Sequence, residues 1–406
     1  MEMVEFKVYP YRWVVLLVFM LVVAVNQLLW ITFAPITGAA ARYYAVDDLS
    51  IGLLSLVFML VYIVVSIPAS WAIDTWGIRT AVGIGAVLTG IFGLLRGLFA
   101  ADYSFVLLAQ IGIAIGQPFI LNAVTTVAAR WFPVRERATA SGLGSLAMYL
   151  GIVSALFLTP SLTLRSDIHG MLLAYGIVSL LASAAFFVFV RESPPSPPCP
   201  PGQEARSLVF DGLKDSLRRR DFVILLIVFF VGLGVFNSVT TWIEDIVRPR
   251  GFSILQAGNI GGLMIVGGII GALVIPVLSD RSRRRTPYLV LGVFGAVLGL
   301  AGITFAASYA LLLASAFVFG FFLLSAGPLG FQYGAEITHP TPEGTSNGLL
   351  LLMGQISGIA FIIGLDSFKS PVNGAMTAPL LALIGMLVVG LLLSTRLKEP
   401  ETLLTG

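Results

Sequence analysis

The chain alternates long apolar segments with short polar ones, and the length of the apolar segments matches a membrane. One helical crossing of a bilayer needs about 20 mainly apolar residues. The pattern predicts six such crossings in the first part of the chain and six in the second. The predicted crossings are 13–38, 51–73, 78–100, 104–130, 138–161 and 169–190, followed by 222–247, 254–279, 286–306, 309–337, 344–366 and 374–396.

A single long polar stretch, residues 191–221, separates the two groups of crossings. It begins with a proline-rich run, which cannot continue a helix and favours extended, solvated backbone. It ends with LVFDGLKDSLRRR, an amphipathic pattern that favours a membrane surface. The chain is therefore predicted to have an N-terminal six-helix half (1–190), a cytoplasmic linker with an amphipathic segment (191–221) and a C-terminal six-helix half (222–406).

Composition agrees with this pattern, because 57% of the residues are hydrophobic and only 11% are charged. A mean hydropathy of +0.96 is far above that of a soluble globular protein. The predicted fold class is therefore all-α integral membrane, with twelve transmembrane helices in two pseudo-symmetric halves. The lone cysteine, Cys199, excludes an internal disulfide and a cysteine-based metal site.

The distribution of charge predicts the orientation in the membrane. Most lysines and arginines fall at the N-terminus, in the linker and after alternate crossings. By the positive-inside rule both termini and the linker are then cytoplasmic, and the protein is a multi-pass protein of the cytoplasmic membrane. No small-residue cleavage pattern follows the first apolar run, so we expect a retained first helix. The basic bias is topological and does not indicate a nucleic-acid partner.

An internal repeat relates the two halves. IPASWAIDTWGIRT follows the second crossing and IPVLSDRSRRRT follows the eighth, so that Asp74 and Asp280 lie 206 residues apart, as do Arg79 and Arg285. WFPVRERATASG and ITHPTPEGTSNG recur in the same way after the fourth and tenth crossings, with an offset of 207. Duplicated halves, each built from three-helix inverted repeats, are typical of transporters that rock about a central site.

These motifs carry a family resemblance. RWFPVRERATASG at 130–142 and the Asp-x-x-Gly-x-Arg of residues 74–79 resemble cytoplasmic loop motifs of the major facilitator superfamily. Four stretches (25–36, 54–79, 116–132 and 327–350) resemble the feline leukaemia virus subgroup C receptor-related family of haem and choline transporters. The resemblance implies a gate at the cytoplasmic face formed by Asp74, Gly77, Arg79 and Arg130. The second copy, with Asp280 and Arg285, lacks the glycine.

The physical basis of such a gate is simple. A carboxylate near arginines can form an ion pair across the seam between halves or meet a helix N-terminus, and the contact breaks when that face opens. The alternative is that Asp74 and Asp280 are solvated residues that only mark topology.

Polar and aromatic groups at mid-membrane depth are the candidates for a substrate site. Taken singly, each amide is as good a helix–helix contact as a ligand contact; as a set, they favour a cavity lining. Amides and aromatics without lysine or histidine suit a neutral polar or cationic solute, to which Trp30 offers a π face. The candidates are Asn26, Gln27, Trp30, Gln110, Gln117, Asn122, Phe236, Asn237, Gln332, Tyr333 and Gln355.

For the substrate, the family resemblance implies a choline-like amine bound by Asn26, Trp30, Gln117 and Gln355. The aromatic residue that the family carries on the seventh helix falls at Phe236 or Asn237, where this chain has no tyrosine. Haem or a vitamin-like metabolite is the alternative substrate. Haem has less support, because His169 and His339 lie at helix ends and not at mid-depth.

Other classes of function are disfavoured to different degrees. The chain has no nucleophile–base pair, metal cluster or phosphate loop that would indicate an enzyme or a cofactor. A non-transporting membrane receptor is the alternative from another class of function. We expect the protein to be a monomer. Proton-driven carriers place titratable acids in the cavity, and none is central in the first half, which favours facilitated diffusion. The candidates for proton coupling are Glu244, Asp245, Glu336 and Asp366.

Overall fold

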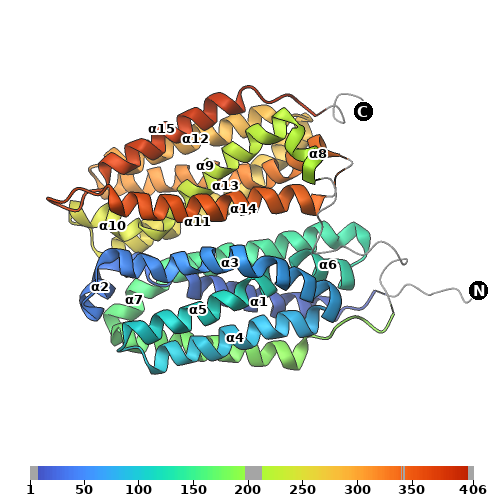
Figure 1. Ribbon diagram of the computed structural model, residues 1–406, viewed down its shortest axis with the longest axis horizontal. Coiled ribbons are helices and arrows are strands. Elements are labelled where there is room, and N and C mark those ends of the chain that lie inside the picture. Colours follow the sequence, from blue (N-terminus) through green and yellow to red (C-terminus); the bar gives the residue numbers. More distant parts are fainter. Residues whose placement is uncertain (1–7, 197–212, 340, 342, 401–406) are drawn as a thin grey trace, which may run out of the picture. The chain divides into compact units, whose positions relative to one another are not determined.

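The computed structural model describes residues 8–196, 213–339, 341 and 343–400, so Cys199 and most of the linker lie outside the described residues. Every regular element in the described part is a helix (Figure 1). The first part of the chain forms α1 (Arg12–Ile31), η1 (Ala34–Ile36), α2 (Thr37–Tyr44), α3 (Asp48–Trp76), α4 (Ile78–Leu98), α5 (Tyr103–Leu121), α6 (Val124–Trp131) and α7 (Val134–Phe189).

The second part of the chain continues the same pattern. It forms α8 (Leu213–Arg218), α9 (Arg220–Thr241), α10 (Ile243–Val247), η2 (Arg248–Arg250), α11 (Ile254–Ser282), α12 (Thr286–Phe305), α13 (Tyr309–Thr338), α14 (Glu343–Ser367) and α15 (Thr377–Ser394). Among the described residues, 11 helices are long and apolar enough to cross a membrane.

Helix α7 covers both of the crossings predicted at 138–161 and 169–190. With 56 residues it would extend about 84 Å, whereas a bilayer core is about 30 Å thick. The connection predicted at 162–168 is reduced to one non-helical residue, Asp167, with φ 60°. The side chain of Asp167 accepts a hydrogen bond from the Gly170 backbone nitrogen at 2.8 Å, which caps the start of the following helical segment.

Three further predicted crossings are interrupted, two of them near a proline. Segment 13–38 stops being α-helical after Ile31, and Pro35 then opens the short helix η1. Segment 104–130 divides after Leu121, three residues beyond Pro118. Segment 222–247 divides at Trp242, whose indole nitrogen donates to the Ile362 carbonyl oxygen at 2.9 Å.

By contacts, the chain forms two compact units. Unit 1 comprises residues 1–32, 60–155 and 162–208, and unit 2 comprises 33–59, 156–161 and 209–406. Each unit has its own apolar core, around Phe19 and Phe132 in unit 1 and around Phe222 and Leu329 in unit 2. Segment 33–59 therefore belongs with the second half of the chain, although it is part of the first half in sequence.

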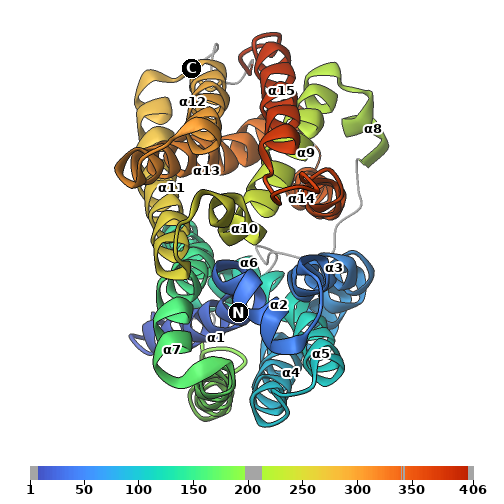
Figure 2. The same ribbon diagram turned by 90° about the vertical axis from the view of Figure 1, so that its left-hand side faces the viewer.

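In unit 2 the long helices pack side by side (Figures 1 and 2). α11 packs on α13, α13 on α12, α12 on α15, and α9 on both α14 and α15. Glycine permits the closest of these approaches, because a Cβ atom at Gly271 would overlap the Phe321 backbone and one at Gly320 the Met264 backbone.

The described part of the amphipathic segment forms the short helix α8, which packs against α9 and α14. Arg219, directly after α8, donates to the carbonyl oxygens of Ile337 and His339 at the end of α13. The predicted contact of this segment with the membrane surface stays a prediction.

Candidate functional site

Helix α1 carries the first two predicted substrate contacts. Asn26 is fully buried, and its Nδ2 atom donates to Thr89 Oγ1 in α4 at 3.1 Å. The Gln27 amide donates to Asn26 Oδ1 at 3.4 Å. Asn26 thus bonds within unit 1, while Trp30, one helical turn further on, is 7% exposed. Asn26 therefore fixes α1 against α4, near the turn that carries Trp30.

That turn of α1 is held by a buried arginine. The Leu29 carbonyl oxygen accepts from Arg96 Nη1 and from Gln110 Nε2, both at 3.1 Å. Arg96 Nη1 also donates to Gln110 Oε1 at 2.8 Å, and the whole Arg96 side chain is buried. Two groups from α4 and α5 therefore fix the backbone directly before Trp30, and Gln110 is engaged with the protein.

The break after Pro118 in α5 places two amides in different roles. Asn122 accepts a hydrogen bond from Tyr62 Oη at 2.6 Å, and its Nδ2 donates to Ser66 Oγ at 3.0 Å and to Ser70 Oγ at 2.9 Å. Gln117 is only 6% exposed, and its amide has no hydrogen-bond partner in the part of the chain that the structure describes. Gln117 is therefore the predicted contact of unit 1 whose polar groups are available to a ligand.

Unit 2 holds the other predicted contacts. Phe236 is buried in α9, and the neighbouring Asn237 donates from Nδ2 to the Gly354 carbonyl oxygen of α14 at 3.2 Å. Gln355 is half-buried and has no hydrogen-bond partner among the described residues. Gln332 is exposed and donates to Glu336 Oε1 at 3.1 Å. Of these predicted contacts in unit 2, Gln355 is the one whose amide has no partner among the described residues.

The first predicted gate is built around the start of α4. Gly77 has φ 86°, and a Cβ atom there would overlap the Glu192 carboxylate. This carboxylate accepts from the backbone nitrogens of Ile78 at 3.1 Å and Arg79 at 2.8 Å, and it forms an ion pair with Arg130. Glu192 therefore caps the positive N-terminus of α4 and joins it to α6.

The second copy of the motif has the same construction at the start of α12. Glu399 accepts from the Arg285 backbone nitrogen at 2.9 Å and from Thr286 Oγ1 at 2.5 Å. The Arg285 side chain pairs with Asp280 and, at 3.1 Å, with Glu336 of α13. These contacts of Arg285 all lie within unit 2, whereas Asp74 of the first copy is half-buried in unit 1.

Sequence reasoning missed Glu192 and Glu399, although a signal was present. They lie 207 residues apart, the offset already seen for the motif after the fourth and tenth crossings, and each follows the last helix of its half. The internal repeat therefore includes the carboxylate that caps the following motif.

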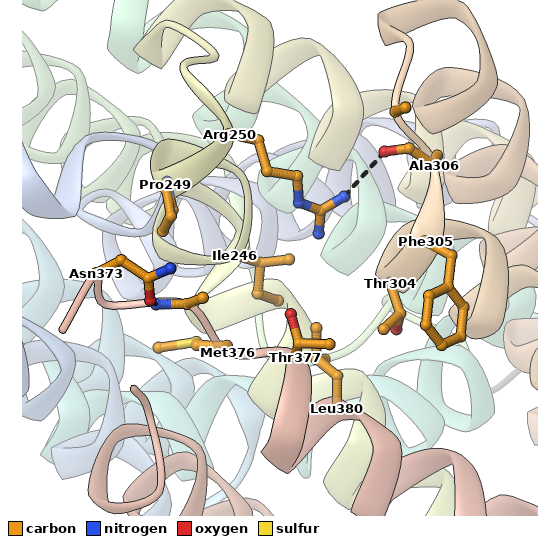
Figure 3. A pocket seen from close by; sticks show the side chains of 12 residues that line it. Ile246, Pro249, Arg250, Thr304, Phe305, Ala306, Asn373, Met376, Thr377 and Leu380 are labelled. Carbon is orange, nitrogen blue, oxygen red and sulfur yellow. Dashed lines mark hydrogen bonds between the residues drawn. The ribbon is translucent and has the colours of Figure 1, made fainter. Parts of the chain in front are cut away.

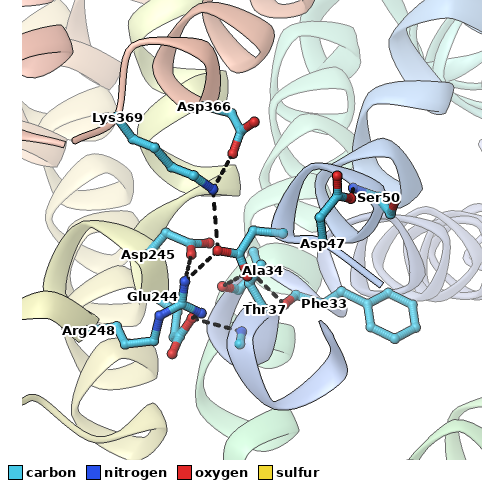
Figure 4. A network of polar contacts seen from close by, with 12 residues as sticks. Phe33, Ala34, Thr37, Asp47, Ser50, Glu244, Asp245, Arg248, Asp366 and Lys369 are labelled. Carbon is cyan, nitrogen blue, oxygen red and sulfur yellow. Dashed lines mark hydrogen bonds and ion pairs between the residues drawn. The ribbon is translucent and has the colours of Figure 1, made fainter. Parts of the chain in front are cut away.

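A cluster of charged side chains, here termed the Arg248 cluster, joins segment 33–59 to the second half of the chain within unit 2 (Figure 4). Arg248 pairs with Asp48 at 2.6 Å, with Glu244 at 3.1 Å and with Asp245. Lys369 pairs with Asp48 at 3.3 Å and with Asp366 at 2.6 Å. The cluster thus consists of Asp48, Glu244, Asp245, Arg248, Asp366 and Lys369.

A backbone contact adds to this cluster. The Gly38 nitrogen donates to Glu244 Oε2 at 3.0 Å, and a Cβ atom at Gly38 would overlap the Arg248 guanidinium. Glu244, Asp245 and Asp366 are among the residues that the sequence predicts as candidates, whereas Asp48, Arg248 and Lys369 are not. The missed residues are charges at the ends of apolar segments, a position that is common for solvated residues.

Burial shifts the ionisation of two of these acids. Burial raises the pKa of Glu244, against the lowering effect of the Arg248 charge. Burial raises the pKa of Asp245 well above its ordinary range; Arg248 lowers it, and the charges of Asp48 and Glu244 raise it again. No group of three or more His, Cys, Asp or Glu among the described residues is arranged to hold a metal ion.

A pocket of about 450 Å³ lies in unit 2 beside η2 (Figure 3). It lies between the ends of η2 and α12 and the start of α15, and its charged residue is Arg250. Arg250 Nη1 donates to the Ile303 carbonyl oxygen at 2.8 Å, where it caps the C-terminus of α12. Burial lowers the pKa of Arg250. None of the predicted substrate or gate residues lines this pocket.

Comparison with known proteins decides the family. The sequence model of the Major Facilitator Superfamily matches residues 19–362. The chain belongs to the Major Facilitator Superfamily. This superfamily protein is thus a multi-pass membrane transporter acting on small molecules. The resemblance expected from the loop motifs is confirmed.

Relatives refine the position within the superfamily. The chain is 31% identical to solute carrier family 49 member A3 of Xenopus tropicalis over 90% of this chain and 80% of that protein. It is 29% identical to the choline/ethanolamine transporter flvcr2b of Danio rerio, over 95% of this chain and 84% of that protein. It is also 29% identical to the choline/ethanolamine transporter FLVCR1 of Felis catus, over 94% of this chain and 73% of that protein.

Solved structures show the same fold at low sequence identity. A bacterial homolog of the human lysosomal transporter Spinster, inward-facing and unoccupied, matches with a TM-score of 0.77 and 16% identity, over 96% of this chain and 98% of that one. The D-xylose-proton symporter matches with a TM-score of 0.76 and 16% identity, over 97% and 99%. The all-helical transporter fold is therefore confirmed.

Proposed function

We propose that this superfamily member is a secondary transporter that moves a small organic cation, choline-like or another amine, by alternating access. The observation that carries the proposal is the fixed turn of α1 that bears Trp30. Arg96 and Gln110 both bond the Leu29 carbonyl oxygen, so the indole stands on a backbone that cannot relax freely. Relatives named as choline/ethanolamine transporters, at 29% identity, support the same substrate class.

The chemistry of the available groups fits an amine. An indole face attracts an ammonium by about 0.5 to 2 kcal/mol, and more strongly where water is excluded. The free amides of Gln117 and Gln355 can bond the hydroxyl or amino end of such a solute. Gln117 belongs to unit 1 and Gln355 to unit 2, and a solute drives a change between conformations only if it binds them unequally. Asn26, Phe236, Asn237 and Gln332 complete the proposed set.

Alternating access also assigns roles to the cytoplasmic motifs. We propose twelve crossings, of which α7 supplies two, with both termini and the linker in the cytoplasm and the protein in the cytoplasmic membrane as a monomer. Asp74, Gly77, Arg79 and Arg130 then form the gate of the first half, and Asp280 and Arg285 that of the second. Glu192 and Glu399 belong to these gates as caps.

The haem alternative draws no support from the histidines. His169 is exposed two residues after the non-helical Asp167, and His339 is the exposed residue that follows α13. Neither the haem nor the receptor alternative has an observation in its favour.

The test is transport by the purified full-length protein in proteoliposomes. Labelled choline should enter liposomes that contain the protein faster than protein-free liposomes, and unlabelled ethanolamine should compete whereas D-xylose should not. Absence of choline and ethanolamine uptake from liposomes that hold folded protein would contradict the proposed substrate class.

A further inference from the structure

The Arg248 cluster holds more negative than positive charge. It has four carboxylates, Asp48, Glu244, Asp245 and Asp366, and two cations, Arg248 and Lys369 (Figure 4). If all six were ionised, the cluster would carry two uncompensated negative charges in a largely buried place. Uncompensated charge is costly away from water, and the usual response is to bind a counterion or a proton.

Within the Arg248 cluster, the surroundings of Asp245 favour a bound proton. Its residue is 2% exposed, and one oxygen pairs with Arg248. The other oxygen, Oδ2, is buried and has no hydrogen-bond partner among the described residues. An ionised carboxylate there leaves a charged acceptor without a donor, whereas a neutral carboxyl removes the charge.

The groups that face Asp245 come from every element around it. Asp48 approaches from α3, Glu244 from α10 itself, Arg248 from η2, and Lys369 from the end of α14 with Asp366 behind it. Arg42 of α2 acts on Glu244. Arg248 is shared among three carboxylates, so it cannot neutralise Asp245 alone.

We propose that Asp245 is a proton-binding site, and that the bound proton keeps segment 33–59 attached to the α10–η2 turn. The attachment consists of the ion pairs of Asp48 with Arg248 and Lys369 and the bond from the Gly38 nitrogen to Glu244. Separation of this segment admits water to Asp245, whose proton then dissociates, because a solvated aspartate has a pKa of about 4.

The sign of the pH dependence follows from linkage. Burial raises the pKa of Asp245 in the attached state, so the attached state binds the proton more tightly than the separated state. Attachment is therefore fully favoured below the pKa of the separated state, about 4, and weakens as pH rises through the higher pKa of the attached state.

The inference extends the proposed function but does not need a substrate to be tested. If the transport cycle separates segment 33–59 from the second half once per turnover, a proton is released and rebound in each cycle. The proposed transporter is then proton-coupled through an acid on α10, which removes the need for an acid in the centre of the first half.

The experiment uses the full-length protein with Cys199→Ser and a reporter, Thr37→Cys. Thr37 is 1% exposed and directly precedes Gly38, so a thiol at this position reacts with a maleimide only after the segment separates. Labelling rates are measured between about pH 6 and about pH 8 with and without Asp245→Asn. Asparagine keeps the shape of the neutral carboxyl and cannot lose a proton.

The rate in the parent divided by the rate in Asp245→Asn cancels the intrinsic pH dependence of the thiol. We expect this ratio to rise about threefold to tenfold with pH, since one unit of pKa difference corresponds to a factor of ten. As a control, Asp102→Asn removes the exposed acid that caps α5. The labelling rate of this variant should depend on pH in the same way as that of the parent.

A ratio that stays constant with pH overturns the proton site, provided that thermal unfolding shows Asp245→Asn to be folded. A protein that fails to transport any amine can still pass this test. Failure of the proton site and failure of the proposed substrate class are therefore distinguishable.

Discussion

At the scale of single side chains, hydrogen bonding separates amides that look alike in the sequence. Gln117 and Gln355 have no partner among the described residues, whereas Asn26 and Asn237 bond to other helices. Sequence predicted the residue types at mid-membrane depth but not their partners, because a partner such as Thr89 lies 63 residues away from Asn26. Contacts of that kind depend on helix packing, and the local pattern does not contain them.

Gly77 provides a residue-scale prediction. Its φ of 86° is costly for a residue with a side chain, and a Cβ atom would displace the Glu192 carboxylate. Gly77→Ala should destabilise the protein by about 1–2 kcal/mol, measured as a lower midpoint of thermal unfolding. The control is Gly142→Ala in α7, where a Cβ atom would meet nothing within 4 Å and the midpoint should stay or rise. Equal midpoints for the two variants would refute this account of the turn.

At the scale of elements, the apolar pattern predicted where helices lie better than where they break. The crossing at 286–306 agrees closely with α12 (Thr286–Phe305). The break after Ile31 comes before Pro35 and the break after Leu121 comes after Pro118, and the connection within α7 is reduced to Asp167. A hydropathy pattern indicates which residues lie in lipid. Residues on both sides of a kink lie in lipid, so the pattern does not reveal the kink.

The duplicated carboxylate caps give the prediction at this scale. Glu192 and Arg130 are 39% and 26% exposed, so solvent screens their pair. A double-mutant cycle of Glu192→Gln and Arg130→Gln, followed by thermal unfolding, should give a coupling energy of about 0.2–1 kcal/mol that shrinks in high salt. A coupling energy that is zero in low salt would mean that the pair does not join α4 to α6.

At the scale of the whole molecule, the repeat in the sequence predicted two halves, and contacts assign two segments of the first half, 33–59 and 156–161, to unit 2. Segment 33–59 belongs by contacts to unit 2, because Asp48 and Gly38 bond to Arg248, Lys369 and Glu244. The sequence could not predict this grouping, since it arises from charges about 200 and 320 residues apart. The expectation of facilitated diffusion rests on the lack of an acid in the centre of the first half, whereas the proposed proton site is Asp245 on α10, which the sequence also offers as a candidate for proton coupling.

The predicted orientation in the membrane can be tested on the same chain. Cys199 should not react with an impermeant maleimide added to intact cells, because the linker is predicted to be cytoplasmic. Val372, which is 92% exposed between α14 and α15, is predicted to lie on the opposite side. Val372→Cys in a Cys199→Ser background should therefore react readily. Rapid labelling of Cys199 from outside would reverse the topology.

The central claim, that Trp30 binds the ammonium of a small amine, is tested most directly by choline uptake in proteoliposomes with Trp30→Phe and Trp30→Ala. Phenylalanine keeps a weaker π face, so uptake at low choline should fall severalfold, and alanine should abolish most of it, consistent with about 0.5 to 2 kcal/mol or more. Trp71→Ala, which removes an indole that is 49% exposed, should leave uptake unchanged. The midpoint of thermal unfolding is measured for each variant as well, because an unchanged midpoint shows that lost uptake comes from lost binding and not from lost folding. Uptake equal to that of the parent in both Trp30 variants would contradict the account.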